Sequence, residues 1–105
     1  MGLMKLEEQV VSLELAKKLK ALNVKQESLF FYSGIGIKRT AMILLSSEYR
    51  QTEPFICSAF TVAELGELLG EYNDTDTVFK IKPKTEADYR AKLLIYLIEE
   101  GIIKP

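Results

Sequence analysis

Residues 29–45 read LFFYSGIGIKRTAMILL, and this stretch decides the fold. Two short apolar runs, at 29–32 and 42–45, flank a segment that contains two glycines. Aromatic and aliphatic runs around a glycine-bearing loop are typical of two strands joined in a hairpin. The sequence therefore predicts a β-hairpin at the centre of the chain.

The two apolar runs lack the pattern of a strand with one face in water. Such a strand alternates apolar and polar residues, and neither run does so. Both faces of the hairpin should therefore be covered, either by helices of the same chain or by a second molecule, because large exposed apolar patches are uncommon on monomers. We expect a homodimer or a protein partner, with self-coverage as the alternative. The candidate interface residues, which occupy alternate positions in the two runs, are Phe30, Tyr32, Met42 and Leu44, and the opposite set is Phe31, Ile43 and Leu45.

A first amphipathic helix is predicted from Ser12 to about residue 22. Leu15, Leu19 and Leu22 recur at positions i, i+4 and i+7, which places them on one helical face. Ser12 is a suitable N-cap, and Asn23 can adopt the left-handed conformation that ends a helix.

Two further helices are predicted after the hairpin. Residues 61–64 read TVAE, a capping box in which Thr61 and Glu64 satisfy each other's backbone amides. The second helix then ends at Gly70. The third runs from an N-cap at Thr85 to Gly101, and its apolar run at 93–98 predicts a position in the core.

The order of elements indicates an α+β fold, with a small antiparallel sheet of three to four strands packed with three helices. Further strands are expected at 55–60 and 78–82. We expect one domain over residues 4–105, with residues 1–3 ahead of a natural start at Met4.

Composition narrows the classes of function. An apolar fraction of 48% among 105 residues is sufficient for a core. The net charge of −1 argues against a nucleic-acid partner, and no apolar run is long enough for a membrane span. The N-terminus does not have the pattern of a signal peptide, so we expect a cytoplasmic protein.

The side chain best suited to acid–base chemistry near neutral pH is missing. The chain has no His and one Cys, which excludes an imidazole base and an internal disulfide. Cys57 lies in an apolar stretch that raises the pKa of a thiol. Gly34-Ile35-Gly36 has Arg39 where a phosphate loop needs glycine, and the acids around Asp74 lack the other ligands of a calcium loop. We therefore predict a protein without catalytic, cofactor-binding or metal-binding residues, and not an enzyme.

Segment 61–70 resembles the first helix of a helix-turn-helix, so a DNA-binding regulator is the alternative function. The residues that follow read EYNDTD. They place acidic side chains at the position where contact with the phosphate backbone of DNA requires basic side chains. This alternative would gain if the lysines of 17–25 joined Lys38 and Arg39 on one surface.

Four segments carry a resemblance to a known group of proteins. They are 10–20 (VVSLELAKKLK), 25–30 (KQESLF), 58–66 (SAFTVAELG) and 91–97 (AKLLIYL). Together they resemble an uncharacterised family of small proteins encoded in gut-bacterial genomes and their phages. The resemblance implies an accessory protein of a phage or mobile element, of unknown biochemical role, and it supplies no catalytic residue or cofactor. Together with the apolar hairpin, it leads us to expect a protein that acts through protein–protein association.

Overall fold

The computed structural model describes residues 6–34, 41–74 and 83–105. The fold class is α+β, as the sequence predicts. Its elements, in chain order, are α1 (Leu6–Gln9), α2 (Leu13–Ala21), β1 (Phe30–Gly34), β2 (Ala41–Leu45), α3 (Ser46–Tyr49), β3 (Cys57–Ser58), α4 (Val62–Leu69), a 3₁₀ helix (Gly70–Asp74) and α5 (Glu86–Glu99).

The sheet is antiparallel, with the strand order β2-β1-β3. The predicted hairpin is present as β1 and β2. The third strand is shorter than the predicted 55–60, because the chain leaves β1 soon after Ser58. The Val11 amide donates to the Phe60 carbonyl at 2.8 Å, and Val10 forms a bridge with Thr61. The end of this segment therefore pairs with the residues before α2 and not with the sheet.

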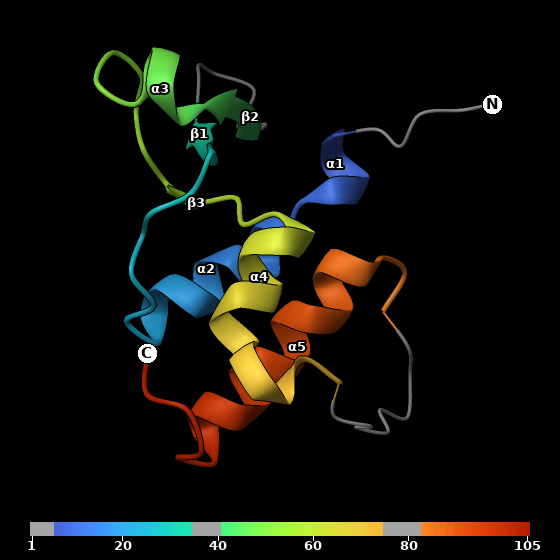
Figure 1. The fold of residues 1–105 in the computed structure, drawn as a ribbon. Helices are drawn as coiled ribbons and strands as arrows, with labels where there is room; N and C mark the ends of the chain where they lie inside the picture. Colours follow the sequence, from blue (N-terminus) through green and yellow to red (C-terminus); the bar gives the residue numbers. More distant parts are fainter. Residues whose placement is uncertain (1–5, 35–40, 75–82) are drawn as a thin grey trace, which may run out of the picture.

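Three helices form the larger part of the core. Helices α2 and α4 both pack against α5, and β3 contacts α2, so β3 joins the sheet to the helical layer (Figure 1). The apolar run of α5 is buried there: Leu93, Leu94 and Leu97 are at most 3% exposed. This places α5 at the centre of the core, as its sequence predicts.

Local sequence signals set the helix ends. Asn23 follows α2 with a φ of 68°, and Gly101 follows α5 with a φ of 74°, so both adopt the left-handed conformation expected at a helix C-terminus. The capping box of α4 is complete. Thr85 caps α5 by accepting from the Asp88 amide at 3.1 Å.

Ser12 precedes α2 in an extended conformation, but its side chain caps nothing. Its backbone amide instead donates to the Asp88 carboxylate at 2.7 Å. This bond links the start of α2 to the first turn of α5, a contact that local sequence does not reveal.

Two short helices were not expected from the sequence. They are α1 and α3, each of four residues, which is too short for an apolar period to show. The predicted strand at 78–82 lies outside the described residues, as do Asp76 and most of the hairpin loop. Within the described ranges, no helix combines the length and the apolar character needed to cross a membrane.

Candidate functional site

The strand register separates the four predicted interface residues. Tyr32 pairs with Ile43, and Ser33 pairs with Met42. Directly opposed residues share a face of the sheet, so Phe30 and Tyr32 lie on one face and Met42 and Leu44 on the other. The prediction that these four share a face is wrong, and so is the grouping of Phe31 with Ile43 and Leu45. The number of residues between the two strands determines which residues are directly opposed and therefore which share a face.

The face with Tyr32 is closed by the helical layer. Tyr32 is 7% exposed, and its phenol donates to the Val11 carbonyl at 2.7 Å. Phe30 and Ile43 pack against the same core. Burial, with a smaller contribution from the negative charge of Asp88, raises the pKa of Tyr32 to about 12. This phenol is therefore a neutral structural donor at ordinary pH.

The opposite face of β1 is covered by the segment that follows β2. Phe31 is fully buried, and its ring centroid lies 5.8 Å from that of Phe55. The Arg50 guanidinium stacks over Phe55 at 3.4 Å from the ring centroid. Lys20 approaches the same ring at 5.3 Å and donates to the Ile56 carbonyl. The chain therefore shields both faces of β1 itself, which is the alternative of self-coverage and corrects the expectation that a second molecule covers one face.

Part of the apolar exposure that remains lies at β2 and the helix that follows it, and other exposed apolar side chains lie elsewhere, at Leu29, Leu68, Tyr96 and Ile102. Strand β2 is at the edge of the sheet, beside β1 only. Met42 is 48% exposed, Leu44 is half-buried, and Tyr49 of the adjoining α3 is 40% exposed. Strand β2 contains no charged residue and no proline, the features that usually protect an edge from pairing.

The backbone of β2 is also available for pairing. The Ser46 amide donates to the Leu29 carbonyl at 2.8 Å. Bonded and non-bonded pairs alternate in an antiparallel ladder, so Met42 and Leu44 bond to β1 while the N–H and C=O of Ile43 point outward. No other strand among the described residues lies along this outer edge.

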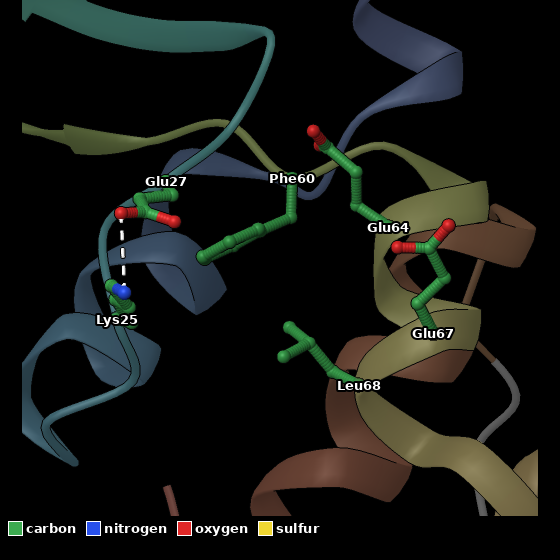
Figure 2. A pocket seen from close by; sticks show the side chains of 6 residues that line it. All are labelled: Lys25, Glu27, Phe60, Glu64, Glu67 and Leu68. Carbon is green, nitrogen blue, oxygen red and sulfur yellow. Dashed lines mark ion pairs between the residues drawn. The ribbon is translucent and has the colours of Figure 1, made fainter.

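A groove lies on another side of the molecule, between the loop after α2 and helix α4 (Figure 2). Its volume is about 260 Å³. The lining side chains are Lys25, Glu27, Phe60, Glu64, Glu67 and Leu68. The sequence does not reveal this groove, because its two walls are more than 30 residues apart in the chain. Leu68, an apolar side chain of α4 that lines one wall, is 39% exposed.

Glu64 fixes the two walls of the groove relative to each other. Its Oε1 atom accepts from the Thr61 amide at 2.8 Å, which completes the capping box, and from the Ser28 hydroxyl at 2.7 Å. Its Oε2 atom accepts from the Leu29 amide at 2.9 Å. One carboxylate therefore joins the start of α4 to the start of β1.

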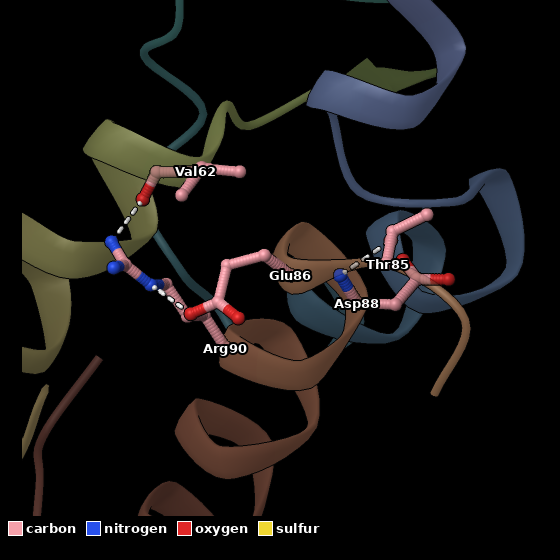
Figure 3. A network of polar contacts seen from close by, with 5 residues as sticks. All are labelled: Val62, Thr85, Glu86, Asp88 and Arg90. Carbon is pink, nitrogen blue, oxygen red and sulfur yellow. Dashed lines mark hydrogen bonds and ion pairs between the residues drawn. The ribbon is translucent and has the colours of Figure 1, made fainter. Parts of the chain in front are cut away.

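A polar network holds α4 on α5 (Figure 3). Arg90 donates through Nε to Glu86 at 3.0 Å and through a terminal nitrogen to the Val62 carbonyl at 2.9 Å. Because Val62 is the first residue of α4, this contact sets where the helix begins relative to α5.

The described residues offer little catalytic chemistry. Cys57 is fully buried, and burial raises the pKa of its thiol against the smaller opposing effect of Lys20 and Lys17. The described part of the chain holds no group of three Cys, Asp or Glu side chains placed to bind a metal ion. Reactive thiolate chemistry is thereby disfavoured at Cys57.

The features that would favour DNA binding are not assembled in the described residues. Lys18 pairs with Glu99 at 3.7 Å, and Lys25 pairs with Glu27 at 3.3 Å. Lys38 and Arg39 lie outside the described residues. The 3₁₀ helix follows α4, and the next described helix begins only at Glu86, whereas a helix-turn-helix needs its second helix after a turn of a few residues.

Comparison with known proteins identifies no relative. No protein-family model matches the chain. No curated protein shows significant similarity to it. No solved structure shows a significant match to its fold.

Proposed function

We propose that the protein is a non-enzymatic interaction module that forms a homodimer by pairing β2 with β2 of a second copy. The observation that carries the proposal is the β2 edge, where the Ile43 backbone points outward beside the exposed Met42 side chain. An unprotected apolar edge strand is a template for another strand. Strand addition is a common mode of protein association.

The strand that pairs with the edge of β2 is β2 of a second copy, because the backbone groups and side chains of β2 are complementary to those of the same strand in antiparallel orientation. A twofold axis at Ile43 would pair the two Ile43 residues through their outward N–H and C=O groups. It would place Met42 of each copy opposite Leu44 of the other, on the face that these residues already share. Apolar cross-strand pairs stabilise a sheet by about 0.2–1 kcal/mol each, and the absence of charge in β2 removes repulsion between the copies.

The dimer should be weak and depend on concentration. Strand β2 has five residues and is followed directly by α3, so the added ladder is short. A stable interface buries at least about 1,200 Å² in total, more than one short strand pair provides. Helix α3, which directly follows β2, carries the exposed Tyr49, and a contact with this side chain would extend the interface.

The resemblance to small proteins of gut bacteria and their phages supports a role as an accessory protein of a mobile element, acting in the cytoplasm. Such a protein works by occupying a surface of another molecule, and pairing through β2 gives two copies that act together. This assignment of role follows by analogy and not from a catalytic group.

Light scattering over a concentration series tests the proposal. The wild-type mass should rise from 11.9 kDa toward twice that value as concentration increases. Met42→Lys should hold the mass at that of the monomer, because a lysine on an edge strand opposes pairing. Tyr96→Lys is the matched control, since Tyr96 is 44% exposed on α5, away from the edge.

The control variant should dimerise as the wild type does. A wild-type mass that stays at one chain at all concentrations would refute the proposal. So would a Met42→Lys variant that dimerises as well as Tyr96→Lys.

A further inference from the structure

We infer that the groove between the loop after α2 and helix α4 binds a basic amphipathic segment of a partner protein. An apolar side chain of that segment would sit against Leu68, above the buried Phe60, and its lysine or arginine residues would face the acidic rim. This inference is independent of the proposed dimer, because the groove and β2 share no residue.

The floor of the groove is apolar and rigid. Phe60 at its base is 1% exposed and belongs to the core, so it supports the groove from beneath and leaves the contact surface to Leu68. Leu68 points into the groove from α4 (Figure 2), and its exposure of 39% leaves apolar area that a partner can cover. Contacts of this kind, at a pocket floor, carry most of the energy of a protein interface.

The rim is acidic. Three glutamates line the groove against one lysine. That lysine, Lys25, is already paired with Glu27 at 3.3 Å. The Glu64 carboxylate accepts three hydrogen bonds within the protein, so the exposed Glu67 is the rim carboxylate that a partner would meet. Glu71, in the 3₁₀ helix that follows α4, is a further exposed carboxylate outside the groove lining. A partner of opposite charge is therefore favoured, and one with acidic residues is repelled.

The size of the groove favours a side chain over a small molecule. Its volume of about 260 Å³ falls below the roughly 300–1,000 Å³ of ordinary ligand pockets. A peptide segment needs only one anchor in such a space, while its other residues lie along the rim. The walls are already held in place by the bonds to Glu64, so binding would not have to order them.

Fluorescence anisotropy with a labelled synthetic peptide tests the inference. The probe is a 14-residue peptide with Leu at helical spacing and Lys elsewhere, compared with a peptide in which Glu replaces every Lys. We expect saturable binding of the Lys peptide, weakened by salt, and no binding of the Glu peptide. Equal binding of both peptides, or no binding of the Lys peptide, would overturn the inference.

Variants locate the site. Glu67→Lys should weaken binding about tenfold, because it replaces attraction by repulsion at the rim. Glu8→Lys changes the net charge equally on α1, where Glu8 is exposed and outside the groove, and it should change affinity less than twofold. An equal loss of peptide affinity in the two variants would show that binding depends on the net charge of the protein and not on the groove, and would overturn the inference.

The apolar anchor has its own test. Leu68→Ser should weaken binding about tenfold and Leu68→Met should restore most of it, with circular dichroism confirming that both variants fold. An affinity unchanged in Leu68→Ser would also overturn the inference. Repeating the titration on Met42→Lys separates the two proposals, because peptide binding should persist when dimerisation is lost.

Discussion

Replacing Glu64 tests whether one carboxylate joins α4 to the start of β1. Its oxygens accept from Thr61, Ser28 and Leu29 over 2.7–2.9 Å. Loss of the capping interaction costs about 1 kcal/mol. A hydrogen bond to a charged group contributes about 1.5–3 kcal/mol, but Leu29 is exposed, so water replaces part of that contribution.

We therefore expect Glu64→Ala to lower the free energy of unfolding by about 2–4 kcal/mol. For a chain of this length each kcal/mol corresponds to about 4 °C in Tm, so Tm should fall by about 8–16 °C. Urea unfolding followed by circular dichroism measures the change, with an unaltered m-value as evidence that the unfolded state is the same.

Two variants on the same segment serve as controls. Thr61→Ala removes the side chain that accepts from the Glu64 amide and should cost about 1 kcal/mol. Glu67→Ala removes an exposed carboxylate from the same helix and should cost less than about 0.5 kcal/mol. The reasoning is refuted if Glu64→Ala destabilises the protein no more than Thr61→Ala does.

Three further predictions concern the buried sheet. The pKa of Tyr32 is about 12 against its ordinary 10.0, so its contribution to stability is complete below pH 10 and is lost as the pH rises toward 12. The difference in unfolding free energy between the wild type and Tyr32→Phe should therefore shrink by about 1.4 kcal/mol from pH 9 to pH 11. A difference that stays constant in urea titrations would contradict this. Cys57 is buried with a raised thiol pKa, so a thiol reagent at pH 8 should label the native protein far more slowly than the unfolded protein, and equal rates would count against the structure. Arg50→Met removes the guanidinium stacked 3.4 Å from the Phe55 ring centroid and should cost about 1 kcal/mol, whereas an unchanged urea midpoint would show that the stack contributes nothing.

Local signals in the sequence predict much of the fold. The hairpin follows from its two apolar runs, and the ends of α2 and α5 follow from Asn23 and Gly101. The capping box at Thr61 sets the start of α4. These features depend on residues within one or two turns of each other, so a short window contains their physical cause.

The candidate sites depend on contacts between residues that are far apart in the sequence, so no short stretch of sequence reveals them. The register that places Tyr32 opposite Ile43 depends on the number of residues between the two strands. A shift of that register by one residue moves every side chain of the strand to the other face. The cover over Phe31 comes from Phe55, 24 positions along the chain. The groove forms because Glu64 binds residues 35 and 36 positions away. The apolar composition of β2 predicts an association surface, and the proposed dimer places that surface at the edge of the sheet.

Amide hydrogen exchange at Ile43, measured over a dilution series, tests the dimer most directly. If β2 pairs with a second copy, this outward N–H gains a partner, and its protection should rise with protein concentration. The amide of Leu44 faces β1 in either state and serves as the internal reference. Fast exchange at Ile43 that is the same at every concentration would contradict the account.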